Sequence, residues 1–315
     1  MKQRLSRYIF RFFAACTAVL VGLAGYQKIC LAKAQKKKDS THFQEYFSTP
    51  WGKIAYRSGG HGRPLLLIHS MMCGASCREW DQVFDALAAE YHVYAIDLPG
   101  FGNSFRPEKP WTAYQYALVL HDFIERHIQR SVCICGANGG GDLALVLSKL
   151  YPEDIRRMVL ISPEGIGKGF ATEADTKPLP LLLSPVAGTQ KFLLGTTKGS
   201  MKAMLERAFY AKERISADLV RQYADAARYG AHAQATYAGI TTRFWAADTK
   251  TAFSSLAVPF LLIWGEENKE NPVFYFHQAE KMTNHGDFAL FEQTGALPHM
   301  ENSRAFCTNL QQFLK

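Results

Sequence analysis

From about residue 44 to the end of the chain, short apolar runs alternate with longer segments in which apolar residues recur every three or four positions. The short runs are typical of strands buried on both faces of a parallel sheet, and the longer segments are typical of amphipathic helices. We expect strands near residues 52–58, 64–69, 92–98, 131–135, 157–162, 258–264 and 288–291, with one more short strand before Pro50. We expect helices at 80–90, 112–128, 139–150 and 303–314. This alternation predicts an α/β fold with a mostly parallel, doubly wound sheet of about eight strands.

The stretch between residues 165 and 256 has a different pattern. It lacks strand-like runs, and Met201, Met204, Leu205 and Phe209 follow helical spacing. We therefore expect a helical cap over the C-terminal edge of the sheet. The predicted organisation is a core of residues 41–164 and 257–315 with the cap, residues 165–256, inserted into it.

The first 40 residues form a basic leader. Residues 12–26 are an apolar run with Arg11 and Lys28 at its ends. A helix of that length spans roughly 22 Å, short of the ~30 Å hydrocarbon core of a bilayer, but flanking basic side chains can extend toward the lipid head groups. The run predicts an N-terminal transmembrane helix that holds a soluble C-terminal domain at a cell membrane. The alternative is a signal peptide cleaved near Ala34, which would give a secreted protein.

The formal net charge of +8 has its origin in this leader. Residues 1–40 hold nine basic side chains and one acidic side chain, whereas the remaining chain holds 27 of each. A basic leader suits the surface of an anionic membrane. Because the rest of the chain has no excess of basic residues, we expect membrane lipid, and no nucleic acid, as a partner.

Five short motifs occur along the chain in a fixed order. They are L-L-I-H-S-M-M at 66–72 followed by Trp80, D-L-P-G-F-G-N-S at 97–104, G-A-N-G-G at 136–140, W-G-E-E-N at 264–268 with Pro272, and G-A-L-P-H at 295–299 with Glu301. Together they resemble the α/β-hydrolase superfamily, in the form with a helical cap, over about residues 44–315. Ser70 stands where that family usually has glycine. The resemblance implies the α/β-hydrolase fold and a catalytic frame at residues 138, 268 and 299.

The third motif has the spacing of a nucleophile elbow. A strained turn from strand to helix needs small residues two positions away on each side of its centre, and Gly136 and Gly140 supply them. The backbone N–H of Gly139 would then face a developing oxyanion, with the N–H of Met71 as the second donor.

The centre of this elbow is Asn138, and the acid position, four residues before Pro272, is Asn268. A carboxamide is a poor nucleophile, and an amide cannot offset the charge of an imidazolium. Only His299 matches its position in the family's catalytic triad. We therefore expect a catalytically degenerate hydrolase homologue that binds an apolar or amphipathic small molecule or a partner.

An active hydrolase remains the alternative, acting on an ester or a related substrate. Glu164 follows the strand at 157–162, where some family members place the acid, so a Glu164–His299 dyad is one arrangement; Glu267 is a weaker substitute. Deamidation of Asn138, which Gly139 favours, would create an aspartate nucleophile. Cys73, Ser70 or Ser76 could act as a displaced nucleophile. A carboxylate within about 2.6–3.2 Å of His299 would favour the enzyme.

No cofactor is expected, because no phosphate-cradling glycine-rich string stands at a strand–helix junction. The seven cysteines lack the spacing of a zinc site, and we expect them to be free thiols, mostly in the core.

Overall fold

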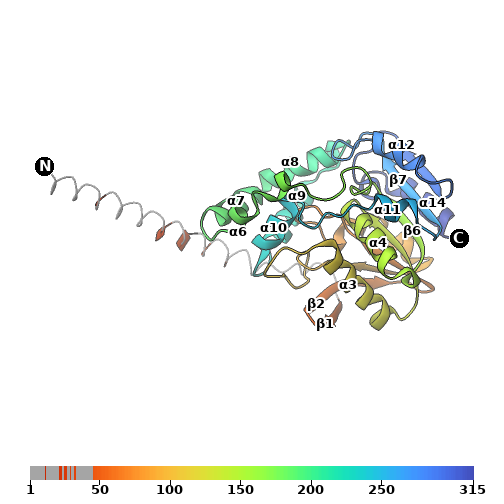
Figure 1. Ribbon diagram of the computed structural model, residues 1–315, viewed down its shortest axis with the longest axis horizontal. Helices are drawn as coiled ribbons and strands as arrows, with labels where there is room; N and C mark the ends of the chain where they lie inside the picture. The colour runs from red at the N-terminus through yellow and green to blue at the C-terminus, as the bar shows by residue number, and fades with distance from the viewer. Residues whose placement is uncertain (1–10, 12–20, 23–24, 27–28, 30–31, 33–44) are drawn as a thin grey trace.

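The computed structural model describes residues 11, 21–22, 25–26, 29, 32 and 45–315. Its centre is an eight-stranded sheet with the strand order β1-β2-β4-β3-β5-β6-β7-β8 (Figure 1). The strands are β1 (Glu45–Thr49), β2 (Gly52–Gly59), β3 (Arg63–Ile68), β4 (Tyr91–Ile96), β5 (Val132–Ala137), β6 (Ile155–Ile161), β7 (Phe260–Gly265) and β8 (Asp287–Phe291). β1 and β2 pair antiparallel, as do β2 and β4, and every pairing from β4 to β8 is parallel.

Helices cover both faces of this sheet because successive side chains of a strand point to opposite sides. In β3, Leu65 and Leu67 pack with α2 (Asp81–Ala88) and α14 (Ser303–Leu314). Leu66 and Ile68 pack on the other face with α3 (Ala113–Phe123) and α4 (Gly139–Leu150). The expected mostly parallel sheet of about eight strands is confirmed, and its helices lie on both faces.

One expected helix changes geometry before its end. The segment predicted as a single helix at 112–128 is α3 followed by a π-helical turn, η2 (Ile124–Ile128). The turn ends at Gln129, whose left-handed backbone (φ 58°) stops the helix. The periodicity located the helix, but it carried no signal of the wider last turn.

Between β6 and β7 the chain forms only helices, turns and loops. Its α-helices are α5 (Glu173–Thr176), α6 (Leu179–Leu183), α7 (Ala187–Gly195), α8 (Lys198–Ala208), α9 (Ala217–Arg228), α10 (Ala233–Thr241) and α11 (Lys250–Ser254). Figure 1 shows α6 to α10 gathered on one side of the core. This is the segment that we expected to form the cap.

Two buried carboxylates connect this helical segment to the core. Asp142 in α4 accepts hydrogen bonds from the backbone N–H groups of Glu164 and Gly165, both at 2.9 Å, and from the hydroxyl of Thr249 at 2.8 Å. Burial raises the pKa of Asp142 to about 7. Glu301 accepts hydrogen bonds from the N–H groups of Tyr210 at 2.7 Å and Ala211 at 3.1 Å. Asp142 therefore fixes both ends of the segment to the core, and Glu301 fixes its middle.

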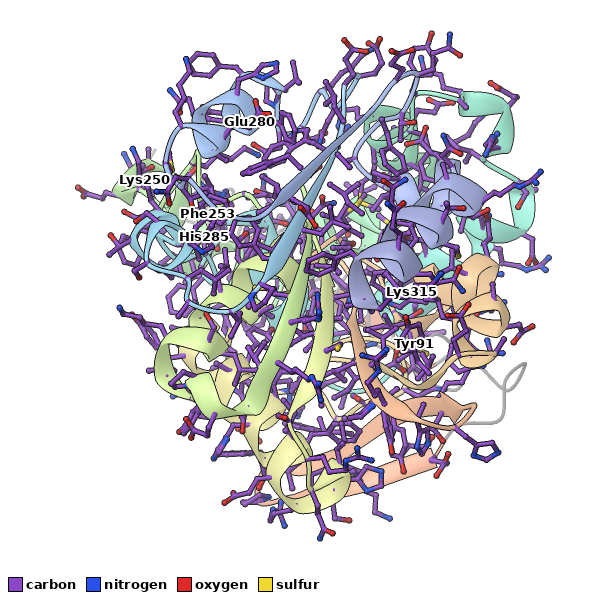
Figure 2. The ribbon with its side chains drawn as sticks, turned by 90° about the vertical axis from the view of Figure 1, so that its right-hand side faces the viewer. Tyr91, Lys250, Phe253, Glu280, His285 and Lys315 are labelled. Carbon is purple, nitrogen blue, oxygen red and sulfur yellow. The ribbon has the colours of Figure 1, made fainter. Side chains whose placement is uncertain are left out.

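The C-terminal part of the sheet is closed by aromatic and polar contacts. Phe253 and His285, labelled in Figure 2, both pack on Phe260, with ring centroids 5.1 and 5.6 Å apart, and Nε2 of His285 lies 2.8 Å from the carbonyl oxygen of Leu256. On the other side of the sheet, the last residue, Lys315, lies near Tyr91, and Arg63 contacts both of them. The end of the chain is thus held against the sheet.

Among the residues that the structure describes, no helix is long and apolar enough to cross a membrane. Most of the apolar run 12–26, where we expected the anchor, lies outside those residues.

Candidate active-site frame

The turn between β5 and α4 has the geometry of a nucleophile elbow. Its central residue, Asn138, has φ 48° and ψ −120°, a backbone conformation that non-glycine residues rarely adopt. A Cβ atom on Gly136 would lie 2.5 Å from the carbonyl oxygen of Gly140. A Cβ on Gly140 would lie 2.4 Å from the carbonyl oxygen of His69. The turn therefore has no room for a side chain at either position.

The residue after the elbow centre is packed as tightly. A Cβ on Gly139 would lie 2.4 Å from Cη2 of Trp245 and 2.6 Å from Cγ of Met71. Met71 thus lies directly against the start of α4, which brings together the two segments expected to supply oxyanion donors. Their donor role itself stays a prediction.

His299 lies in α13 (Pro298–Glu301) and has no exposed surface. Its ring packs on Trp80, with 4.3 Å between the ring centroids, and near Phe306. Neither ring nitrogen has a hydrogen-bond partner within the described chain. Burial lowers the pKa of His299 to about 3, so the imidazole is neutral at physiological pH.

The acid position forms part of a turn. Oδ1 of Asn268 accepts hydrogen bonds from the N–H groups of Glu270 at 3.1 Å and Asn271 at 2.9 Å. This is the local hydrogen bonding by which asparagine stabilises turns. The Asn268 side chain forms these hydrogen bonds within its own loop, and no hydrogen bond joins it to His299 in the described structure.

Glu164 does not pair with His299, so the dyad considered under the active-hydrolase alternative is not formed in this structure. The Glu164 carboxylate lies 3.2 Å from Nζ of Lys168 and 3.9 Å from Nε of Arg243. These two cations of the helical segment hold the carboxylate away from the histidine. The substitute, Glu267, is exposed to solvent and makes no hydrogen bond to His299, whose ring nitrogens have no partner among the described residues.

The sequence analysis missed Glu79. This buried carboxylate accepts hydrogen bonds from the N–H of Ser70 at 2.8 Å, from the Ser70 hydroxyl at 2.7 Å and from the Tyr223 hydroxyl at 2.7 Å. Its Oε2 lies 4.0 Å from Nε2 of His299, beyond hydrogen-bond distance. Glu79 directly precedes Trp80, a residue of the first motif. This position is the feature of the sequence that could have identified Glu79 as a candidate.

The displaced nucleophiles considered from the sequence are all occupied or inert. The Ser70 hydroxyl is buried and donates to Glu79. Burial raises the pKa of Cys73 to about 12, which keeps the thiol protonated. The Ser76 hydroxyl accepts a bond from the N–H of Arg78 at the start of a short 3-10 helix, η1 (Cys77–Trp80).

A cavity of about 600 Å³ lies between the elbow and the helical segment. It brings together five of the candidate site residues considered from the sequence: Met71, Cys73, Asn138, Glu164 and Asn268. Most of its remaining wall is apolar or charged, from Met72, Met201, Met204, Ile240, Trp245, Lys168, Arg207, Arg243 and Glu270. His299 is fully buried and is not among the lining residues.

A strand–elbow–helix turn, a histidine after the last strand and a cavity above the elbow define the class of α/β-hydrolase-fold proteins. The sequence model of the alpha/beta hydrolase family matches residues 65–308. The chain belongs to this family, as the motif order indicated.

Known proteins similar to the chain include enzymes of this family. The pimeloyl-[acyl-carrier protein] methyl ester esterase of Vibrio cholerae is 23% identical over 270 residues, which cover 82% of this chain and 97% of the esterase. The crystal structure of CarC, a serine hydrolase involved in carbazole degradation, superposes with a TM-score of 0.71 at 21% identity, over 86% of this chain and 98% of CarC. A membrane phospholipase A described as a bacterial virulence factor superposes with a TM-score of 0.70 at 21% identity, over 100% of this chain and 98% of the phospholipase.

Because burial lowers the pKa of His299 to about 3, acid should destabilise the fold through this residue. In the unfolded chain the imidazole takes up a proton near pH 6.5, whereas in the folded chain it stays neutral down to about pH 3. The free energy of unfolding therefore decreases as the pH falls from about 6.5 toward 3. Between pH 7 and pH 5 this contribution is about 2 kcal/mol. Thermal unfolding of His299→Phe, which keeps an aromatic ring against Trp80, should show a smaller loss of Tm over that range than wild type. The exposed His61→Leu serves as control, and a wild-type pH slope retained in His299→Phe would show that the ring is not the buried neutral group described here.

The strained backbone of Asn138 gives a second expectation. Glycine adopts φ 48°, ψ −120° without the steric cost of about 1 kcal/mol that asparagine incurs. Asn302, at φ −133°, is the matched control, since Asn302→Gly relieves no strain but carries the same entropic cost of a new glycine. In a thermal melt, Asn138→Gly should therefore have a Tm ~2 to 4 °C above that of Asn302→Gly. A Tm of Asn138→Gly equal to or below that of Asn302→Gly would mean that the side chain at the elbow stabilises the turn.

Proposed function

We propose that this protein is a catalytically degenerate alpha/beta hydrolase that binds an apolar or amphipathic small molecule in the cavity above the elbow. The observation that carries the proposal is the pairing of an Asn138 elbow with a His299 that has no hydrogen-bonded acid among the described residues. The fold keeps a cavity for a ligand, and the described residues place neither a hydroxyl nucleophile at the elbow centre nor an acid hydrogen-bonded to His299.

The chemistry supports loss of the triad mechanism on two counts. The carboxamide of Asn138 offers no hydroxyl proton for a histidine to remove. His299 is a weak base, because burial lowers its pKa to about 3 and no carboxylate of the described residues stands within hydrogen-bond distance to stabilise an imidazolium. Each change alone would slow acyl transfer by orders of magnitude.

The cavity wall favours an amphipathic ligand. Methionine side chains and Trp245 supply an apolar surface that adapts to irregular shapes. Lys168 and Arg243 both face Glu164, so a ligand carboxylate or ester could compete for these two cations. A protein partner inserting an apolar side chain would use the same wall.

The leader supports a place at a membrane. Its excess of basic residues and the apolar run 12–26 suit a single-pass anchor, with the folded domain outside the bilayer. A protein titled a membrane phospholipase A is among the solved structures with a similar fold. Residues 1–40 would then keep the cavity near a source of amphipathic molecules. Secretion after cleavage near Ala34 is the competing outcome.

A second candidate, an active hydrolase, is favoured by one observation, the 4.0 Å approach of Glu79 to His299. If the Tyr223 and Ser70 hydroxyls released Glu79, the carboxylate could orient the imidazole toward a water molecule. The relatives include esterases and other hydrolases, which is consistent with this role. The candidate requires wild-type turnover that His299→Ala abolishes.

Ligand binding is the direct test of the proposal. Octanoate, a soluble amphipathic carboxylate, should bind the full chain in lipid nanodiscs, with heat measured by titration calorimetry and the signal of empty nanodiscs subtracted. Ala203 lines the cavity from α8, and the neighbouring Lys202 does not. Ala203→Trp should weaken binding at least about tenfold by filling the space, and Lys202→Trp should leave it unchanged.

Equal binding by both tryptophan variants would contradict a ligand in this cavity. Absence of octanoate binding in wild type would contradict the proposed ligand class.

A further inference from the structure

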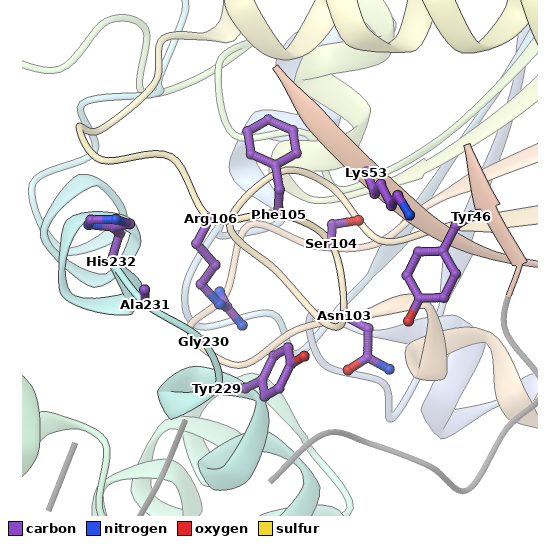
Figure 3. Close-up of a pocket in the computed structure, with 10 residues that line it drawn as sticks. All are labelled: Tyr46, Lys53, Asn103, Ser104, Phe105, Arg106, Tyr229, Gly230, Ala231 and His232. Atoms are coloured by element: carbon purple, nitrogen blue, oxygen red, sulfur yellow. The ribbon is translucent and has the colours of Figure 1, made fainter. Parts of the chain in front are cut away.

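A second cavity, of about 470 Å³, opens between the beginning of the core and the helical segment (Figure 3). Tyr46 of β1 and Lys53 of β2 form one wall, and the loop 103–106 forms the floor. Residues 229–232, which lead into α10, form the opposite wall. This cavity shares no lining residue with the one above the elbow.

The charged side chains that line this second cavity are positive. Lys53 and Arg106 line it, and no carboxylate is among its lining residues. Arg106 donates from Nη2 to the carbonyl oxygens of Gly102 at 3.2 Å and Ala226 at 2.8 Å, which fixes the guanidinium in place. Its Nε is buried without a hydrogen-bond partner in the described chain. The guanidinium therefore holds a fixed positive charge beside the cavity.

A helix terminus adds to the same positive field. α10 (Ala233–Thr241) begins at the cavity wall, and its N-cap residue, His232, makes no side-chain capping bond. His232 has a left-handed backbone (φ 62°), as does the neighbouring Gly230 (φ 80°). The first N–H groups of a helix carry partial positive charge and form a ready anion site.

Two further polar side chains converge on the same space. Figure 3 shows the side chains of Arg106, Asn103 and Tyr229 directed toward one another across the cavity, with Lys53 and Tyr46 at its other side. Burial lowers the pKa of Arg106 to about 10, so its charge persists at neutral pH. Donors thus surround the cavity from the core strands, the loop and the helical segment.

We propose that this cavity binds a phosphate group, either as free phosphate or as the headgroup of a phospholipid. A tetrahedral phosphate presents several acceptor oxygens and up to two negative charges, which suits donors arriving from three directions. The site is independent of the elbow and of the function proposed for it. Its ligand would hold the beginning of the core and the start of α10 together.

Binding of two soluble probes to the full chain in maltoside micelles tests the site. Inorganic phosphate represents the free anion, and dihexanoyl phosphatidic acid represents the headgroup, with dihexanoylglycerol as its phosphate-free control. Wild type should bind at least one of the phosphate-containing probes by titration calorimetry. Lys53→Glu, which changes an exposed side chain, should weaken that binding at least about fivefold by reversing one charge of the site.

Lys149→Glu makes the same charge change at the exposed end of α4, far along the chain from the cavity, and should leave binding unchanged. Arg106→Gln should abolish binding, and circular dichroism would establish that the variant is folded. Binding of inorganic phosphate would identify the free anion, and binding of phosphatidic acid alone would identify the headgroup. Failure of wild type to bind either probe, or equal weakening by Lys53→Glu and Lys149→Glu, would overturn the proposal.

Discussion

The close approach of backbone to backbone at the elbow is the constraint on which the rest of the molecule depends. Gly136 and Gly140 touch so closely that neither position admits a Cβ, and Gly140 also abuts the carbonyl oxygen of His69. This contact fixes β5, α4 and the loop after β3 relative to one another. It also forces Asn138 into a strained conformation that brings its side chain to the cavity. In active members of the family such strain presents a nucleophile, and here it presents a carboxamide.

Buried carboxylates of the core connect the surroundings of this turn to the helical segment. Asp142, one turn along α4, holds the chain where it leaves the core, and Glu301, beside His299, holds it near the middle of the helical segment. Glu79 holds the loop after β3 through Ser70 and reaches Tyr223 of α9. These acids therefore position the roof of the cavity. Glu79, which lies 4.0 Å from His299, uses its oxygens in these structural hydrogen bonds. His299 therefore stays neutral and has no hydrogen-bond partner in the described chain.

The strands were predictable because strands buried on both faces appear in the sequence as short apolar runs. The apolar runs at 64–69 and 131–135 are β3 and β5, and the glycines of the elbow are where the strained turn requires them. The carboxylates around His299 were not predictable in the same way. Glu164 follows the expected strand, but its carboxylate pairs with Lys168 and Arg243 instead of His299. That pairing depends on how the helical segment folds. Glu79 has a motif neighbour in Trp80, but its partners are distant in sequence, with Tyr223 lying 144 residues away.

In the function proposed above, the alpha/beta-hydrolase catalytic frame is retained, but Asn138 and Asn268 replace its nucleophile and its acid. Reaction with a fluorophosphonate, followed by measurement of the intact mass, is the sharpest test of this function, because the reagent forms a covalent adduct with an activated serine. We expect no adduct on the wild-type chain and one adduct on Asn138→Ser combined with Asn268→Asp. An adduct on wild type that disappears in His299→Ala would contradict it, since the protein would then possess an active nucleophile that the structure does not identify.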